Sequence, residues 1–543
     1  MASSVVNSSA CLGRDFVVEL GLTQPVPEDR AARYRAARWW DSSQLRDGIE
    51  AGASASPGRV ALVDNERTWT RAQLADAVTR CTSALRTRGV QRGTPLVLVA
   101  GNHGAGVVAY QAALRSGAVT AVLDRRCGLA DLLAALDALR APATTVTLVV
   151  PRSERQRLEA GPSNVTTIDL EDLVADATSP VGDWQEPDRD APATVLFTSG
   201  TTGRPKGVVH SLNTLTAGAA NMARITGTDE QTVLFLVSPL TSITGVMQMH
   251  LAADQHATLV LEDRFDPERS LARIDEYGAT LLGGAPVIAE RLLRAADARK
   301  THTTALRTLA LGGSMLPMPL LELATDRFGI EVARVYGSSE APNSTGSVPE
   351  DPRARRLADD GVLMPGTEVR VGSAPHPQEG LLRGPAVFLG YLDAEHNAES
   401  FDDGWYRTGD AVELHEGRLT VVGRIKDVVN RNGLKISPSE IDAALATLAD
   451  TIEYSCFGVA DTETGERLAV AVRPVDGRSI TLDIVCTHLQ AQGMATRKLP
   501  EQLVVWDEPL PRTASGKIVR SRLVMESPAK HNEYVDRLTN ASS

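Results

Sequence analysis

Lys206 and the residues just before it form the stretch of this chain best suited to handling phosphate groups. Six small residues, four of them with hydroxyls, precede it: Thr198, Ser199, Gly200, Thr201, Thr202 and Gly203. Glycines permit tight turns and close backbone approaches, so hydroxyls and backbone N–H groups can face a phosphate chain. A lysine adds a mobile positive charge. Because the spacing is not that of a Walker loop, we predict a phosphate-binding loop of another kind.

The distribution of lysine supports a chemical role for this loop. A stretch rich in Ser, Thr and Gly is most often a surface turn. The chain contains 56 Lys and Arg residues, of which seven are lysines, at 206, 300, 426, 435, 498, 517 and 530. Arginine thus supplies nearly all of the positive charge, and a lysine inside a polar loop is more often required for chemistry. The same reasoning singles out Lys517, which follows Pro-Arg-Thr-Ala-Ser-Gly.

A tyrosine and two carboxylates complete the set of candidate site residues. In the motif Tyr336-Gly-Ser-Ser-Glu340, the glutamate would repel phosphates unless a cation lay between them. Mg²⁺ suits this position because it takes one or two carboxylates together with phosphate oxygens. Tyr336 is either a core ring or a stacking surface for a base. Asp410, after Thr-Gly, is either a turn aspartate or an acceptor for two ribose hydroxyls.

The elements that would position these residues are short apolar strands alternating with Ala-rich helices. This alternation predicts an α/β fold with largely parallel sheets, including strands at 96–100, 119–123, 146–150 and 195–197 and a helix at 105–114. Four further strands run into Gly-, Ser- or Pro-rich loops, in residues 234–245, 281–286, 309–317 and 332–340. Ligands of open α/β sheets bind beyond the carboxyl ends of strands, so we expect these loops to converge on one crevice.

The remaining segments suggest how the chain divides into domains. Residues 1–45 form an Arg-rich extension, with a helix expected from Pro27 through Trp40 and laid on the main body. Residues 347–365 are typical of a surface loop, and residues 379–410 predict hairpins of a β-rich subdomain. Helices at 437–448 and 482–492 and strands at 454–459 and 468–472 indicate a small α+β unit. We therefore predict a large domain over 1–425 and a small domain over 426–543.

The composition is that of a soluble globular protein. At 543 residues, with 43% hydrophobic and 23% charged residues, the chain is too long for one ordinary core. Its net charge of −12 and pI near 5.4 argue against a nucleic-acid partner. The sequence has neither an apolar run of transmembrane length nor a secretion signal. Five scattered cysteines are expected to be reduced, which predicts a cytoplasmic location: Cys11, Cys81, Cys127, Cys456 and Cys486.

Taken together, the motifs resemble those of the adenylate-forming enzymes, a superfamily that includes acyl-CoA synthetases, peptide-synthetase adenylation domains and firefly luciferase. The resemblance covers roughly residues 50–525 and rests on stretches 198–206, 336–340, 406–410, 423–427 and 511–517. It implies a large N-terminal domain of stacked sheets and a small, mobile C-terminal domain. It also implies two steps, in which a carboxylate attacks the α-phosphorus of MgATP and a thiol, such as that of coenzyme A, then captures the acyl group.

The resemblance implies a role for each candidate residue. Lys517, Glu340 and Lys206 would be catalytic, Lys517 by bridging the attacking carboxylate and the α-phosphate. Glu340 would also hold Mg²⁺. Lys426 would be the hinge about which the small domain turns, and Gly433 with Asn432 would approach CoA. The ATP-binding residues would be Thr198, Ser199, Gly200, Thr201, Thr202, Gly203, Lys206, Gly312, Gly313, Ser314, Tyr336, Gly337, Ser339, Asp410, Arg424 and Lys517.

The loops expected to hold the acyl group predict an apolar acid. Residues 238–247, 283–287 and 312–316 contain no Asp, Glu, Lys or Arg, so a buried ionised tail would lie there unpaired. We predict a fatty, alicyclic or aromatic acid, bound by Leu240, Ser242, Ile243, Val246, Gly284 and Ala341. Three positions depart from many relatives: Thr241-Ser242 replaces an aromatic residue and a histidine, Ser339 a threonine, and Asn432 a glycine.

A free-standing acyl-CoA synthetase, an acid–thiol ligase, is the preferred interpretation, and two other functions stay open. The strand at 234–237 lacks the Asp that peptide-synthetase domains use for an amino group, which disfavours an α-amino acid. One alternative is an acyl-AMP ligase that loads a carrier protein, although no carrier domain follows Lys517 in this chain. The other is a non-catalytic ATP-binding or interaction protein, against which Lys206 and Lys517 argue. Whether the chain forms a homodimer is also open.

Overall fold

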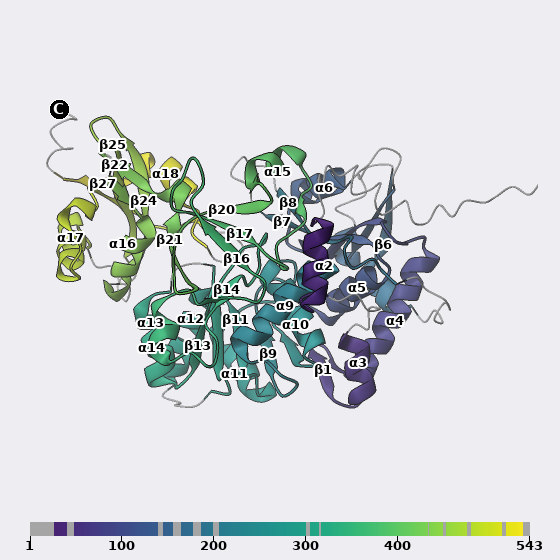
Figure 1. The fold of residues 1–543 in the computed structure, drawn as a ribbon. Helices are drawn as coiled ribbons and strands as arrows, with labels where there is room; N and C mark the ends of the chain where they lie inside the picture. The colour runs from purple at the N-terminus through teal and green to yellow at the C-terminus, as the bar shows by residue number, and fades with distance from the viewer. Residues whose placement is uncertain are drawn as a thin grey trace, which may run out of the picture.

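Three β-sheets organise the chain. The structure is a computed structural model, and it describes residues 26–40, 48–139, 145–155, 164–176, 186–198, 206–299, 304–313, 316–432, 434–448, 452–474, 479–512 and 517–535. Over these residues, two large sheets and their helices form the main body, and a smaller sheet near the C-terminus forms a unit at one end (Figure 1). The structure therefore confirms a mixed α/β fold with a large N-terminal and a small C-terminal part.

The first large sheet carries the strands on either side of the Thr198–Lys206 stretch. Its strands lie in the order β18-β8-β7-β4-β3-β5-β6, and the ladder from β7 to β6 is parallel. Helices including α4 (Arg71–Thr87), α5 (Gly104–Arg115), α6 (Leu129–Ala138) and α8 (Leu170–Ala175) connect these strands. The strands are β3 (Pro95–Ala100), β4 (Val119–Asp124), β5 (Val146–Val150), β6 (Val165–Asp169), β7 (Pro192–Thr198), β8 (Lys206–Ser211) and β18 (Gly390–Tyr391).

The second large sheet begins parallel and continues antiparallel. Its parallel part contains β1 (Val60–Val63), β10 (Thr258–Leu261), β9 (Val233–Leu236), β11 (Leu281–Gly284), β12 (Thr308–Gly312) and β13 (Glu331–Tyr336), with β2 (Thr68–Thr70) on its edge. Helices α9 (Leu212–Thr226), α10 (Ile243–Asp254), α11 (Pro267–Tyr277), α12 (Pro286–Ala298) and α13 (Met318–Glu322) link or cover these strands. Its antiparallel part contains β14 (Thr345–Gly346), β15 (Val362–Leu363), β21 (Arg418–Arg424), β20 (Trp405–His415), β19 (Phe401–Asp402), β17 (Glu379–Arg383) and β16 (Glu368–Val371).

The small C-terminal sheet has a core of its own. Helices α16 (Pro438–Ala444) and α17 (Leu482–Ala491) contribute buried side chains to a cluster with Val429, Leu468 and Leu503. The helix expected at 437–448 is shorter and ends in a 3₁₀ turn, Ala446–Leu448. The strands are β22 (Val429–Arg431), β23 (Leu434–Ile436), β24 (Ile452–Asp461), β25 (Gly465–Pro474), β26 (Gln502–Val505) and β27 (His531–Tyr534).

Three local predictions from the sequence are wrong. Residues 347–365 are not only a surface loop, because they include α14 (Arg353–Ala358) and β15, which joins two strands of the second large sheet. The helix near the N-terminus, α2 (Glu28–Ala36), ends before Trp40, whose buried indole donates to the Pro385 carbonyl at 2.9 Å. Gly390-Tyr391 is not a hairpin of the β-rich part, since it pairs with β8 of the first sheet.

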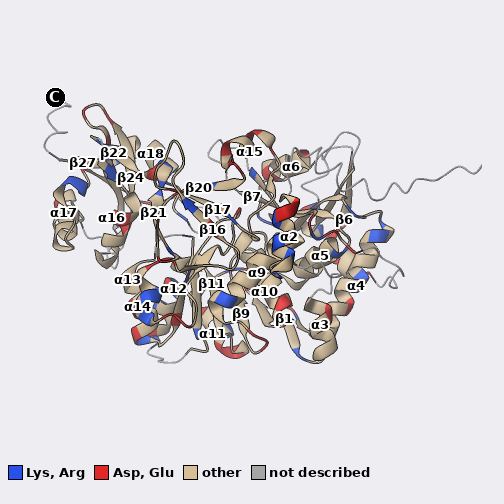
Figure 2. Cartoon of the chain, in the orientation of Figure 1, with Lys and Arg blue, Asp and Glu red and all other residues tan. Residues whose placement is uncertain are grey.

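The described surface carries charges of both signs. Lys and Arg lie interspersed with Asp and Glu along the visible elements (Figure 2). No helix within the described ranges combines the length and the apolar character that crossing a bilayer requires. Four cysteines of the described chain, Cys81, Cys127, Cys456 and Cys486, are free thiols, while Cys11 lies outside the described residues.

Candidate active site

Four adjacent parallel strands bring their loops together at one edge of the second sheet, namely the edge formed by the carboxyl ends of the strands. The order β13-β12-β11-β9 places the carboxyl ends of these strands side by side, as the sequence pattern predicted. Two glycines are required where backbones approach closely. A Cβ on Gly312 would lie 2.2 Å from the Val335 carbonyl oxygen, and one on Gly337 would lie 2.5 Å from the Asn343 nitrogen. The loops therefore pack against one another without side chains at these points.

Asp410 is held at this edge by two partners. It stands opposite Arg424 in the β20–β21 ladder, and its Oδ1 lies 2.8 Å from Arg424 Nε. Its Oδ2 accepts a hydrogen bond from the Tyr336 hydroxyl at 2.9 Å. Burial raises the pKa of the Asp410 carboxyl, while Arg424 and Tyr336 oppose that rise. Burial also raises the pKa of Tyr336 well above its usual value, so the phenol stays neutral and donates.

Glu340 is oriented by a tyrosine that the sequence analysis did not select. The Tyr391 hydroxyl donates to Glu340 Oε1 at 2.7 Å, and the Glu340 carbonyl accepts from Phe388 N at 2.8 Å. Lys206 Nζ lies 5.1 Å from the centre of the Tyr391 ring, within the range of a cation–π contact. Tyr391 thus contacts both Lys206, in the first large sheet, and Glu340, which follows β13 of the second large sheet. Burial beside Glu340 raises the pKa of Tyr391, which keeps its proton.

The surroundings of Glu340 fit Mg²⁺ bound largely through phosphate oxygens. Within the described ranges there is no group of three or more His, Cys, Asp or Glu side chains that would hold a metal ion by itself. Mg²⁺ is commonly held by one or two carboxylates and by substrate phosphates. A single glutamate next to Lys206 suits that arrangement.

Lys517 reaches this edge from the C-terminal part of the chain. A Cβ on Gly313 would lie 3.1 Å from Lys517 Cε and 3.2 Å from Nζ, and Gly313 has a φ of +81°. Glycine here leaves the space that the lysine occupies. Desolvation by the walls of the crevice and repulsion from Arg424 lower the pKa of Lys517, whereas Asp410 and Glu340 raise it. The structure thus gathers Lys517, Asp410, Arg424 and Glu340 around one point.

Arg520 anchors the segment that carries Lys517. Its Nε donates to the Cys456 carbonyl at 2.9 Å, and Nη2 donates to Asp442 Oδ2 at 2.6 Å. Its Nη1 reaches Asp427 Oδ2 at 3.3 Å, in the 3₁₀ turn Ile425–Asp427 that contains Lys426. The guanidinium therefore links the lysine segment to the turn between the large and small parts. Lys426, the predicted hinge residue, is exposed and lies in this turn.

A hydrogen bond crosses between the large and small parts beside that turn. The Ser437 hydroxyl donates to the Val422 carbonyl at 3.0 Å. A Cβ on Gly423 would lie 2.5 Å from Ser437 Oγ, so a larger residue there would displace this hydroxyl and its hydrogen bond. Asn432 is exposed and has a φ of +52°, a left-handed conformation that glycine and asparagine adopt most readily. The backbone at this position therefore suits Asn as well as Gly.

The residues expected to bind the acyl group differ in accessibility. Leu240, Val246 and Ala341 are buried in the core, whereas Ser242, Ile243 and Gly284 are partly exposed. Ser242 caps α10, because its hydroxyl accepts from Gly245 N at 3.2 Å. A Cβ on Gly284 would meet Ser238 Oγ, at 3.2 Å, and no second described atom within 4 Å. A side chain at position 284 would therefore press on the Ser238 hydroxyl.

Asn102, which the sequence analysis missed, fixes the loop between β9 and α10. Its Oδ1 accepts from Leu240 N at 2.8 Å, and its Nδ2 donates to the carbonyls of Ser238 and Glu262, both at 3.0 Å. An asparagine after a buried strand is a common turn residue, so the sequence alone gave no reason to select it.

The structure describes some of the remaining candidate residues and leaves out others. Ser199, Gly200, Thr201, Thr202, Gly203, Ser314 and Gly433 lie outside the described residues. Thr198 ends β7, and the carbonyl of Ser339 accepts a hydrogen bond from His210 at 2.7 Å.

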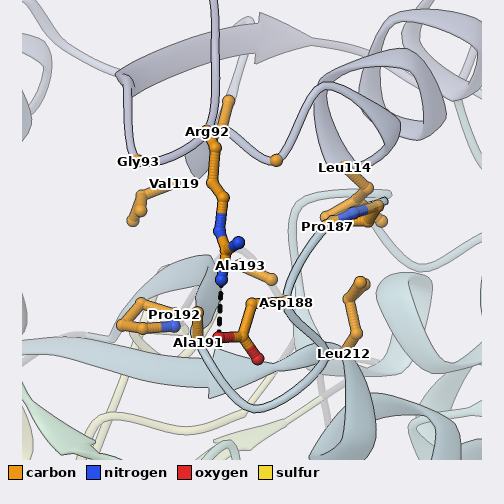
Figure 3. Close-up of a pocket in the computed structure, with 12 residues that line it drawn as sticks. Arg92, Gly93, Leu114, Val119, Pro187, Asp188, Ala191, Pro192, Ala193 and Leu212 are labelled. Carbon is orange, nitrogen blue, oxygen red and sulfur yellow. Dashed lines mark hydrogen bonds and ion pairs between the residues drawn. The ribbon is translucent and has the colours of Figure 1, made fainter. Parts of the chain in front are cut away.

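One cavity of the structure is not part of the candidate site. This cavity, of about 20 Å³, is bordered by the Arg92–Asp188 ion pair of 2.6 Å (Figure 3). It lies next to the amino ends of β4 and β7, opposite the edge that carries the site.

Comparison with known proteins decides the family. The model of the family described as AMP-binding enzyme matches residues 49–392. The chain belongs to this family. Its membership among the AMP-binding enzymes confirms the resemblance that the five motifs indicated.

Curated relatives of this AMP-binding enzyme align over most of both chains. The medium-chain fatty-acid–CoA ligase of Escherichia coli strain K12 is 30% identical over 90% of this chain and 92% of its own. The salicylyl-CoA synthase / salicylate adenylyltransferase of a Streptomyces species is 31% identical over 92% of this chain and 96% of its own.

A solved structure of the same fold is the o-succinylbenzoate CoA synthetase of Bacillus subtilis in complex with its acyl-adenylate intermediate. It superposes with a TM-score of 0.78 at 26% identity, covering 89% of this chain and 98% of that one. The same enzyme in complex with ATP and a magnesium ion gives a TM-score of 0.77, also at 26% identity, over 89% of this chain and 100% of that one.

Proposed function

We propose that this AMP-binding enzyme is an ATP-dependent acid:CoA ligase, an AMP-forming acyl-CoA synthetase that acts on an apolar acid. In its first step, the substrate carboxylate attacks the α-phosphorus of ATP, forming acyl-AMP and releasing pyrophosphate. In its second step, the thiol of CoA attacks the acyl carbonyl, and AMP leaves. The observation that carries the proposal is the convergence of Lys517 with Asp410, Arg424 and Glu340 beside Gly313.

The nucleotide would lie along the edge formed by β12, β13 and β20. Asp410 is the acceptor for the ribose hydroxyls, because each carboxylate oxygen that meets Arg424 or Tyr336 keeps a further lone pair. The adenine lies between Tyr336 and the strand end at Gly312 and Gly313. Lys206 and the hydroxyl-rich stretch before it hold the β- and γ-phosphates. Glu340 holds Mg²⁺, which neutralises charge on the triphosphate.

Lys517 is the residue that acts on the reacting atoms. Its ammonium lies where negative charge grows between the carboxylate and the α-phosphate, and a preorganised cation there lowers the barrier. The space for the acyl group lies beside the partly exposed Ser242, Ile243 and Gly284. Leu240, Val246 and Ala341 support this space from the core.

The second step requires a turn of the small domain, residues 426–543, about Lys426. Lys517 belongs to the first step, and the turn replaces it at the crevice by the segment containing Asn432 and Gly433, which approaches CoA. The Ser437–Val422 hydrogen bond and the Lys517–Gly313 contact belong to the adenylating arrangement and would break on turning.

The acid is proposed to be bulky and apolar, with an aromatic or alicyclic group favoured over acetate, α-amino acids and dicarboxylates. The loops of the acyl space supply no charged side chain before Glu340, so an ionised tail would be unpaired there. The relatives include ligases named for medium-chain fatty acids and for salicylate, which agree with this proposal, and also ligases named for the dicarboxylates 2-succinylbenzoate and oxalate.

A panel of carboxylic acids tests the proposed function. Each acid is incubated with ATP and Mg²⁺, and pyrophosphate release and CoA-thioester mass are measured. We expect both products from bulky apolar acids. Pyrophosphate without CoA thioester, together with acylation of a carrier protein, would support the carrier-loading alternative. Pyrophosphate from no acid would support the non-catalytic alternative.

Location and partners are proposed from bulk properties. A cytoplasmic enzyme without a nucleic-acid partner agrees with the acidic composition and the mixed surface charge (Figure 2). A homodimer is tested by sedimentation of the full chain at micromolar concentration.

A further inference from the structure

A second cavity lies between the helices α3 (Gly48–Ala55), α4, α5 and α10 and the strands β1 and β10. Its volume is about 40 Å³, more than the roughly 10–15 Å³ that one water needs. Among the lining residues, the polar side chains are Arg71, Gln111 and His256. The apolar side chains of the walls include Ile49, Leu62, Leu74, Val107, Met249 and Leu259.

This cavity is separate from the crevice of the candidate active site. Both involve α10, but the residues assigned to the acyl group lie in its first turns, from Ser242 to Val246. The cavity is lined by Met249, Ala252 and Ala253, toward the other end of the helix. None of its lining residues is among those assigned to the nucleotide, the acyl group or CoA. A ligand in this cavity would therefore occupy a site of its own.

Arg71, the first residue of α4, is a buried cation in the wall of this cavity. Only 3% of its surface is exposed. Its Nη2 donates to the His256 carbonyl, and its Cδ would lie 3.5 Å from a Cβ placed on Gly52. Because Gly52 and His256 also line the cavity, the guanidinium lies among the lining residues. Its Nη1 has no hydrogen-bond partner within the part of the chain that the structure describes.

The charge of Arg71 is not paired with a carboxylate of the described residues. Glu230, the acidic residue whose charge acts on it, lies 3.6 Å from a different arginine, Arg59. Burial and repulsion from Arg59 lower the pKa of Arg71, and the attraction of Glu230 opposes them. A buried cation without a counter-ion is costly, because it has lost its hydration and gained no opposite charge. An anion in the cavity would remove that cost.

The lining of the cavity determines which anion fits. The N–H groups of Nη1 are donors that a carboxylate oxygen accepts, and such charge-assisted hydrogen bonds are strong. The apolar walls favour a ligand with a hydrocarbon part, because burying that part removes apolar surface from water. The volume restricts the hydrocarbon part to a few carbon atoms. Together these features describe a short aliphatic acid in its ionised form.

We infer that this cavity is a binding site for a small monocarboxylate, whose carboxylate pairs with Arg71 and whose short alkyl group packs on the apolar walls. The inference goes beyond the proposed function, because it assigns a second ligand at a place where no step of the acid:CoA ligase reaction occurs. The two ligands also differ in size, since the proposed substrates are bulky acids and the ligand of this cavity is a short one.

Titration of the unaltered enzyme with butyrate tests the inference. Sodium butyrate is compared with butyramide, which lacks the charge, and with sodium formate, which lacks the alkyl group, by calorimetry at constant ionic strength and without ATP. We expect butyrate to bind about 10-fold or more tightly than either compound. Equal binding of butyrate and butyramide, or no binding of butyrate at millimolar concentration, would overturn the inference. Equal binding of butyrate and formate would overturn it as well, because the apolar walls would then contribute nothing.

Two variants show whether butyrate binds in this cavity. Arg71→Leu removes the charge and Ala252→Leu fills the space while keeping Arg71, so each should weaken butyrate binding about 10-fold or more. Both should leave kcat/KM for a bulky apolar acid within about 3-fold. Arg59→Leu, which removes a neighbouring arginine that pairs with Glu230, is the matched control and should keep butyrate binding. Butyrate binding that survives in both variants would refute the assignment, because butyrate would then lie elsewhere.

Thermal unfolding separates a ligand-binding role of Arg71 from a purely structural one. A ligand that binds only the folded state raises Tm, so butyrate should raise the Tm of the unaltered enzyme and of Arg59→Leu but not of Arg71→Leu. If butyrate changes the Tm of none of them, Arg71 only holds the His256 carbonyl and the inference is wrong. Should Arg71→Leu fail to fold, the response of Ala252→Leu decides the question, because that variant retains the arginine.

Discussion

The two sides of the crevice differ in how firmly their charged groups are held. On the nucleotide side, Asp410 has Arg424 and Tyr336, and Glu340 has Tyr391, all within the large N-terminal part. On the other side, Lys517 arrives from the small part, across a contact with a glycine. The first set is held by contacts within the large part, whereas the position of Lys517 depends on how two parts of the chain are placed.

This difference assigns different tasks to the two sides. Groups fixed within one part of the chain can bind the nucleotide throughout a reaction, because their geometry does not change when another domain moves. A group on a separate unit can be present for one step and absent for the next. Arg520, three residues after Lys517, also contacts Asp427 in the turn, so its side chain links the lysine segment to the turn.

The comparison is tested most strongly by Lys517→Ala. If Lys517 serves only acyl-AMP formation, pyrophosphate release should fall by about 10²-fold or more, because one preorganised charge is lost. Thioester formation from synthetic acyl-AMP should stay near the original rate. The control is Lys498→Ala, which removes a small-domain lysine paired with Glu440 away from the crevice. Equal losses in both half-reactions would show that Lys517 is not confined to acyl-AMP formation.

Lys426→Pro tests whether the small part must turn. Proline fixes φ, and an incompatible backbone costs about 3 kcal/mol, which corresponds to roughly 10²-fold. We expect thioester formation from acyl-AMP to fall by about that factor while pyrophosphate release is retained. Lys426→Ala keeps the backbone free and should behave like the unaltered enzyme. Should both half-reactions survive in the proline variant, the hinge lies elsewhere.

Asp410→Asn and Tyr336→Phe test whether the side that holds Asp410 and Glu340 binds the nucleotide. Asp410→Asn removes the charge that pairs with Arg424 and should raise the KM for ATP about 10-fold. Tyr336→Phe removes one hydrogen bond to Asp410 and should raise it by about 3-fold. Tyr277→Phe, on α11 away from the site, is the control. An effect confined to the KM of the acid would contradict the assignment of this side to the nucleotide.

The smallest expected effect is on the alkaline limb of the pH profile. The pKa of Lys517 is lowered by desolvation and by Arg424. Its charge, and with it the rate of acyl-AMP formation, is complete at low pH and is lost as the pH rises through that lowered value. The loss should therefore begin below the usual lysine pKa near 10.5. Lys517→Arg should be slower but should keep its residual rate to higher pH, measured by single-turnover pyrophosphate release.

Burial of His210 makes a separate, structural contribution to pH dependence. Burial lowers the pKa of this fully buried imidazole to about 4, from 6.5, so the folded protein holds it neutral. The unfolded chain binds a proton there between these values. The free energy of unfolding should thus fall as the pH drops from 6.5 toward 4, and His210→Gln should flatten that slope in denaturant titrations. An unchanged slope would show that His210 is protonated in the folded state.

Local pattern was sufficient to predict the order of strands and loops. The strands at 96–100, 119–123 and 146–150 appear within one residue of their expected limits, because buried parallel strands are continuous apolar runs. The four loops lie at one edge because parallel strands share their direction. The scarcity of lysine led to Lys517 and Lys206 before any geometry was known.

Contacts between residues far apart in the chain needed the tertiary structure. Tyr391 orients Glu340 across 51 residues, and Asn102 holds Leu240 across 138, in each case between segments that belong to different sheets. Sequence described Gly390-Tyr391 as part of a hairpin, since neighbouring residues do not tell which sheet a two-residue strand will join. Such partners depend on the packing of whole sheets rather than on local propensity.

Lys517 and Gln248 illustrate the difference between what the sequence determines and what the tertiary structure determines. The amino-acid sequence determined that a lysine stands in a polar loop and that a glutamine interrupts an apolar helix. Only the tertiary structure decided that the lysine lies over Gly313 and that one face of the glutamine amide is taken by Gly283. The reason is that residue type sets which hydrogen bonds and charges are available, while their directions are set by backbone segments that meet only in the folded chain.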